Sequence, residues 1–171
     1  FEMLEVMTIL LPLSILNSFL NIFFFKFQKR KYVIDQVMKK YFLFICFPGV
    51  FLGLLFLKFF NQYINFNILV SLIIWLVLLA SFLHKKNNLN PLFKIRKSVT
   101  FLTGFVHGVT NSGGSLLSIL MIETYKKNVD YIRYQIIFFY FFLALFQYLS
   151  IILIHDFGFF RSLALPYILS L

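Results

Sequence analysis

The chain has 171 residues, of which 61% are hydrophobic, 21% aromatic and only 13% charged, and its net charge is +10. Soluble domains hold roughly 45–50% apolar and about 25% charged residues, and a chain of this length cannot bury so large an apolar excess. The composition therefore excludes an ordinary soluble domain and predicts an all-α integral membrane protein, a multi-pass helical bundle in a lipid bilayer. Because the 16 basic residues stand in short runs between apolar stretches, they predict membrane orientation and no nucleic-acid partner.

Three apolar stretches, 6–25, 41–57 and 66–83, come first, and a helix needs ~20 such residues to span a bilayer. Asn17 and Asn21 lie four apart on one face of the first stretch, so we expect them to bond across helices or to line a substrate path. Gly49 and Gly53 in the second stretch form a GxxxG pair, which lets another helix approach closely.

Basic loops follow the first and third stretches, at 26–40 and 84–98, whereas Lys58 is the single basic residue between the second and third. Basic loops stay on the cytoplasmic side. We therefore predict that both loops are cytoplasmic and that the protein lies in the plasma (inner) membrane.

The fourth stretch, 99–122, differs in kind, because its middle reads GFVHGVTNSGGSLLS. We predict a helix that breaks there, and it either spans as two half-helices or turns back as a re-entrant hairpin bent at 111–114. The re-entrant form keeps Lys126, Lys127 and Arg133 on the cytoplasmic side, so the charge bias favours it.

A fifth stretch, 131–154, is aromatic-rich, and a sixth begins at about 163. The chain starts at Phe1 and stops inside an apolar run, so we expect a piece cut from a longer protein at both ends. Residues 1–98 would be the latter part of one transporter half, and residues 99–171 the start of a second.

The break is the candidate binding site. Irregular backbone at membrane depth is tolerated only inside protein or beside water, and transporters use half-helix N-termini there to hold anions. The predicted substrate-binding residues are Asn111, Ser112, Gly113, Gly114, Ser115 and, one turn earlier, His107. The alternative is a packing kink, with Gly104 and Gly108 as a second GxxxG pair and His107 as a buried neutral imidazole.

All six acidic residues fall at or near the ends of apolar stretches, so a cation relay built on buried carboxylates is unsupported. No second histidine lies within helical reach of His107, and we predict no metal site. The sequence contains no nucleophile–base–acid set, metalloprotease motif or phosphate loop, so we expect neither an enzyme nor a cofactor.

Two segments resemble the TauE/SafE family of sulfite exporters. One is the glycine-spaced helix, Asn/Gly-Gly turn, charged loop and Arg of GFVHGVTNSGGSLLSILMIETYKKNVDYIR, and the other is the Pro-containing helix, basic loop and Pro/Gly helix within 11–56. The resemblance implies a permease of two related halves that exports sulfite, organosulfonates or similar small anions. It carries over Gly104, Gly108, Asn111, Gly113 and Gly114 as motif residues.

We therefore predict a permease for small oxyanions, with an oligomeric state that the sequence leaves open. The rival hypothesis is a non-transporting membrane scaffold or assembly protein, in which the Gly-rich segment only packs helices.

Overall fold

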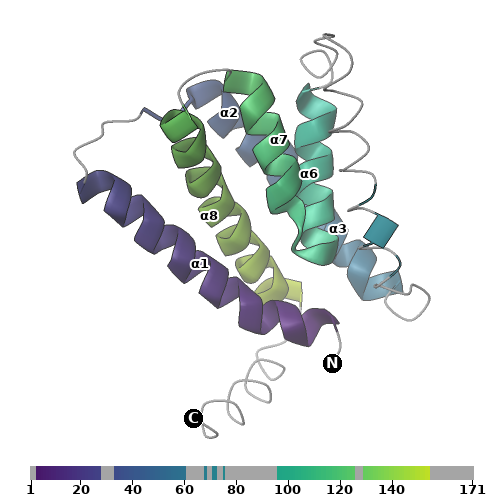
Figure 1. Cartoon of the computed structure of the whole chain (residues 1–171). Helices are drawn as coiled ribbons and strands as arrows, with labels where there is room; N and C mark the ends of the chain where they lie inside the picture. The colour runs from purple at the N-terminus through teal and green to yellow at the C-terminus, as the bar shows by residue number, and fades with distance from the viewer. Residues whose placement is uncertain are drawn as a thin grey trace, which may run out of the picture.

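A computed structural model of the chain describes residues 3–27, 33–60, 68, 71–72, 75, 96–125 and 129–154. These residues form helices, without a strand among them (Figure 1). The helices are α1 (Met3–Phe27), α2 (Gln36–Tyr41), the π-helix η1 (Phe42–Cys46), α3 (Phe47–Phe60), α6 (Arg96–Thr110), α7 (Gly113–Tyr125) and α8 (Val129–Ile154). The predicted third and sixth stretches, at 66–83 and from 163, lie outside the described residues apart from four positions.

Three helical segments are long and apolar enough to cross a membrane: Met7–Phe27, Gln36–Phe60 and Val129–Ile154. They contain nearly all of the predicted stretches 6–25, 41–57 and 131–154. Large apolar side chains remain exposed along them, among them Phe24 at 62% and Leu153 at 82%, as expected where lipid is the solvent. The prediction of an all-α membrane bundle is thereby confirmed.

α1 and α8 lie side by side and antiparallel (Figure 1). Phe25 packs against Tyr134 at one end with ring centroids 5.8 Å apart, and Phe19 lies 6.4 Å from Phe141 further along. Among the described residues, Asn17 and Asn21 bond to each other within α1: Asn21 Nδ2 donates to Asn17 O at 2.8 Å and to its Oδ1 at 3.2 Å.

The second span begins earlier than the sequence predicted, inside the basic loop 26–40. Asp35 caps α2 by accepting hydrogen bonds from the backbone N–H groups of Val37, at 2.8 Å, and Met38, at 3.2 Å. A side-chain oxygen at this position satisfies donors that the first helical turn leaves open. The helix then continues through η1 into α3, so the chain is helical from 36 to 60.

Glycines bring α3 and α6 together backbone to backbone. A Cβ atom on Gly104 would collide with the carbonyl oxygen of Cys46, and one on Gly108 with that of Val50. From α3, a Cβ on Gly49 would lie 2.7 Å from Phe101 O, and one on Gly53 would collide with Phe105 O. We call these four glycines the glycine seam.

α6 and α7 form a helical hairpin. Figure 1 shows the two helices side by side, joined at their lower ends, and Gly113 at the start of α7 lies against Thr103 and His107 of α6. The described parts of the two helices have 15 and 13 residues, which correspond to about 22 and 20 Å of helix. The chain thus reverses at the break, as in the re-entrant alternative.

Basic side chains gather where the hairpin begins and ends. Lys26 ends α1, Lys39 and Lys40 close α2, Arg96 and Lys97 open α6, and Arg133 opens α8. We call this the basic end. At the opposite end the described residues contribute Lys58, whose Nζ donates to the carbonyl oxygen of Ile154 at 3.2 Å.

Gly104→Ala should destabilise the protein by about 1–3 kcal/mol, because the new methyl meets a backbone carbonyl that cannot rotate away. Thermal unfolding in detergent measures the loss. Leu102→Ala, which changes a half-exposed side chain on the same helix (49%), is the control. A Gly104→Ala protein that melts at the same temperature as the control would contradict close packing at the seam.

Candidate functional site

The hairpin turns within two residues. α6 ends at Thr110 and α7 begins at Gly113, and Asn111 between them has a φ of 57°. Asparagine tolerates this left-handed conformation better than most residues. The Asn111 N–H donates to His107 O at 2.8 Å, so the turn closes on the last turn of α6.

Side chains beyond α6 donate hydrogen bonds to carbonyl groups at its end. Gln147 of α8 donates from Nε2 to His107 O at 2.9 Å, and Ser112 Oγ donates to Thr110 O at 3.2 Å. The Thr110 hydroxyl donates to Val106 O at 2.9 Å. The bonds from Gln147 and Ser112 reach acceptors that a helix C-terminus leaves open, and they reduce its partial negative charge.

The amide end of α7 is left open. Gly113, Gly114 and Ser115 supply its first N–H groups, and among the described residues no side chain accepts a hydrogen bond from them. The two nearby hydroxyls bond elsewhere, Ser112 Oγ to Thr110 O and Ser115 Oγ to Ser112 O at 3.0 Å. Open N–H groups at a helix start carry partial positive charge and bind anions.

Several buried side-chain atoms near this turn have no hydrogen-bond partner among the described residues. His107 has 0% exposure, yet neither ring nitrogen makes a hydrogen bond within the described part of the chain. Asn111 Oδ1 and Gln147 Oε1 are also buried without a partner, and both residues donate to the same His107 carbonyl. Buried polar groups are almost always hydrogen-bonded, so three such residues at one turn mark a position for a further polar group.

α8 places the turn in the middle of the bundle. Tyr140, near the centre of α8, lies with its ring 5.7 Å from that of His107, and a Cβ on Gly114 would lie 2.9 Å from Tyr140 Cε2. The hairpin tip, residues 107–115 with Tyr140 and Gln147, is therefore enclosed by protein on the α8 side, while Ser115 is exposed.

The structure brings His107, Asn111, Ser112, Gly113, Gly114 and Ser115 together at the tip. Gly113 also packs the hairpin, since a Cβ there would lie 2.5 Å from His107 Cβ and 2.7 Å from Thr103 O. Gly49, Gly53, Gly104 and Gly108 lie in the glycine seam instead.

Sequence reasoning missed Gln147 and Tyr140. The available signal was Gln147 itself, a polar residue inside the apolar stretch 131–154, which indicates a buried partner. Three or more His, Cys, Asp or Glu side chains do not gather as a metal site in any described part of the chain.

Two further buried side-chain oxygens, Tyr125 Oη and Gln135 Oε1, lie at the basic end. There Gln135 Nε2 donates to Val33 O at 2.9 Å, which ties α8 to the segment before α2. Burial, and next the nearby Asp35 carboxylate, raise the pKa of the Tyr125 phenol, which therefore stays protonated.

No protein family model, curated protein or solved structure matches the chain. The resemblance to the TauE/SafE family thus stays a prediction from the two segments that carry it.

Asn111→Gly should leave the hairpin's stability nearly unchanged, because glycine adopts a positive φ without strain. Asn111→Val should cost about 1–3 kcal/mol, since a β-branched residue is strained there. Thermal unfolding of the two variants in the same detergent tests this, and equal melting temperatures would contradict the left-handed turn.

Proposed function

We propose that the protein is a membrane permease for small anions and that the hairpin tip holds the substrate. The observation that carries this proposal is the asymmetry of the tip. Side chains donate to the carbonyl oxygens of His107 and Thr110 at the end of α6, whereas no side chain of the described residues accepts a hydrogen bond from the first N–H groups of α7. His107, whose ring nitrogens have no hydrogen-bond partner among those residues, lies beside these N–H groups. Such a site stabilises negative charge, and broken helices of this kind serve substrates in transporters.

The charge distribution supports an anion over a cation. The described acids of the hairpin and its neighbours, Asp35, Glu123 and Asp130, stand near the basic end and not at the tip. An oxyanion bound at the tip would contact N–H, hydroxyl, amide and imidazole groups, and no carboxylate of these three residues would repel it. The narrower substrate class, sulfite or organosulfonate-type oxyanions, rests on the resemblance alone.

The proposed orientation follows from the basic end. Positively charged segments stay in the cytoplasm, so the hairpin would enter the plasma (inner) membrane from the cytoplasmic side and return to it. The tip would then lie near the bilayer centre, where a bound substrate could become accessible from either side as the bundle moves.

A scaffold or assembly protein remains the second candidate, and one observation favours it. Gly113 packs directly on Thr103 and His107, as a helix kink without a ligand would require. For the same reason a bulky residue at Gly113 cannot separate the two functions, because it would disrupt the hairpin in either case.

The variant Ser115→Asp distinguishes the permease from the scaffold. Ser115 is exposed and belongs to the first turn of α7, where a carboxylate stabilises a helix by about 0.3–1 kcal/mol. The fixed negative charge would occupy the open N–H groups and repel an anion. We expect a folded variant whose anion flux falls at least tenfold, whereas the isosteric neutral variant Ser115→Asn keeps its flux.

Flux would be measured from proteoliposomes that hold the full-length protein and are loaded in turn with sulfite, sulfate, thiosulfate and a small sulfonate. Folding of each variant is checked by thermal unfolding. If none of the four anions leaves the proteoliposomes faster than it leaves empty liposomes, with or without an ion gradient, the scaffold function is favoured. Equal flux from the Asp and Asn variants would place the site away from the tip.

A further inference from the structure

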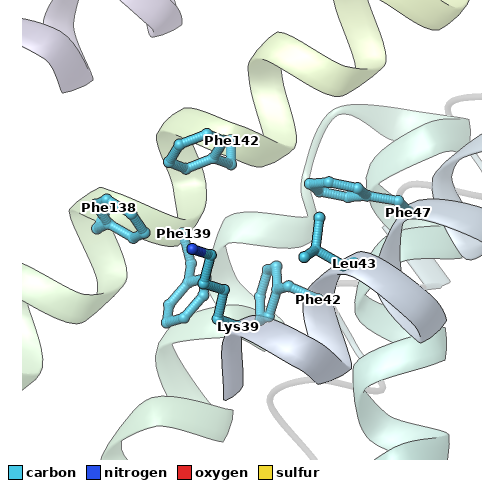
Figure 2. Close-up of a pocket in the computed structure, with 7 residues that line it drawn as sticks. All are labelled: Lys39, Phe42, Leu43, Phe47, Phe138, Phe139 and Phe142. Atoms are coloured by element: carbon cyan, nitrogen blue, oxygen red, sulfur yellow. The ribbon is translucent and has the colours of Figure 1, made fainter. Parts of the chain in front are cut away.

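A pocket of about 100 Å³ lies between the second span and α8, away from the hairpin tip. Figure 2 shows its lining, which consists of one lysine and six apolar side chains: Lys39, Phe42, Leu43, Phe47, Phe138, Phe139 and Phe142. Its position on the outside of two membrane-crossing helices distinguishes it from the proposed substrate site.

The π-helix shapes this pocket. Phe42 and Phe47 stand five residues apart, which would separate them by about 140° on an α-helix, but the wider π-turn brings such residues near one face. Phe42 stacks on Phe139 and Phe47 stacks on Phe146, each pair with centroids 4.3 Å apart. Both stacked pairs join the second span to α8, and Phe42, Phe139 and Phe47 of these pairs line the pocket.

Lys39 supplies the pocket's charge. It lies one turn before η1, at the basic end, and its side chain is exposed. In Figure 2 its ammonium group points toward the space that the phenyl rings surround. The described residues give it neither a hydrogen bond nor an ion pair, so this cation is available to an external anion.

The outer wall of the pocket faces lipid. Leu43 and Phe142 are 46% and 37% exposed, and the adjacent Phe44 is 77% exposed. Apolar side chains of this size are exposed on a spanning helix where acyl chains cover them, and long basic side chains extend from such depths to the headgroups.

We propose that this pocket binds one anionic phospholipid, with an acyl chain between the phenyl rings and its phosphate on Lys39. The apolar lining and the single unpaired cation at headgroup level complement the two parts of such a lipid. The inference is independent of the proposed transport function.

Native mass spectrometry of the full-length protein in detergent, titrated with dioleoyl phosphatidylglycerol or dioleoyl phosphatidylcholine, tests the site. Phosphatidylglycerol should bind first and more tightly. Lys39→Gln should weaken its binding by about fivefold, the effect of one basic residue near an anionic surface. Lys40→Gln, which neutralises the neighbouring exposed lysine outside the pocket, should have little effect.

A second pair of variants tests the apolar part of the pocket, which is proposed to hold the acyl chain. Leu43→Trp fills the pocket and should weaken binding of both lipids, whereas Leu52→Trp, at a similarly exposed site (47%) on α3, should not. Equal losses from Lys39→Gln and Lys40→Gln would mean diffuse attraction by the basic end and would overturn the proposal. Unchanged binding by Leu43→Trp, or equal affinity for the two lipids in the wild type, would overturn it as well.

Discussion

The close contact between α3 and α6 fixes the position of the hairpin. In lipid there is no hydrophobic force to drive helices together, so association depends on packing and on small residues that let backbones meet. The glycine seam provides this contact, with Gly104 against Cys46 and Gly108 against Val50. Since α7 packs in turn on α6, the seam also sets where the hairpin tip lies relative to Tyr140 and Gln147 of α8.

The tip joins the C-terminus of α6, which carries partial negative charge, to the N-terminus of α7, which carries partial positive charge. Side chains form hydrogen bonds with the first end but not, among the described residues, with the second. Gln147 and Ser112 donate to carbonyl groups at the end of α6, while no side chain in the described chain accepts from the first N–H groups of α7. Had both ends been capped, the turn would be a packing device only. The imidazole of His107, whose nitrogens have no hydrogen-bond partner among the described residues, lies at the same place.

Much of this fold could be predicted from the sequence, because long apolar runs have few alternatives in a bilayer. The break at 111–112 was predictable for the same reason, since Asn-Ser-Gly-Gly interrupts an apolar run. The sequence could not show which helices pack together. The GxxxG pair Gly49 and Gly53 predicts a close helix neighbour, but the structure is needed to show that this neighbour is α6. For Asn17 and Asn21 the sequence showed a polar pair on one helix face, but it did not show that the two side chains bond to each other within α1.

The π-helix η1 sets how α2 is rotated about the helix axis relative to α3. A π-turn amounts to one extra residue inserted in an α-helix, and one residue corresponds to about 100° of rotation. Removing a residue from Phe42–Cys46 would therefore rotate the two parts of the helix against each other. With Gly49 and Gly53 held on α6, α2 would swing by more than a quarter turn, carrying Asp35 away from Tyr125 and Lys39 away from the phenyl rings. The length of this short segment is thus constrained more strictly than its composition.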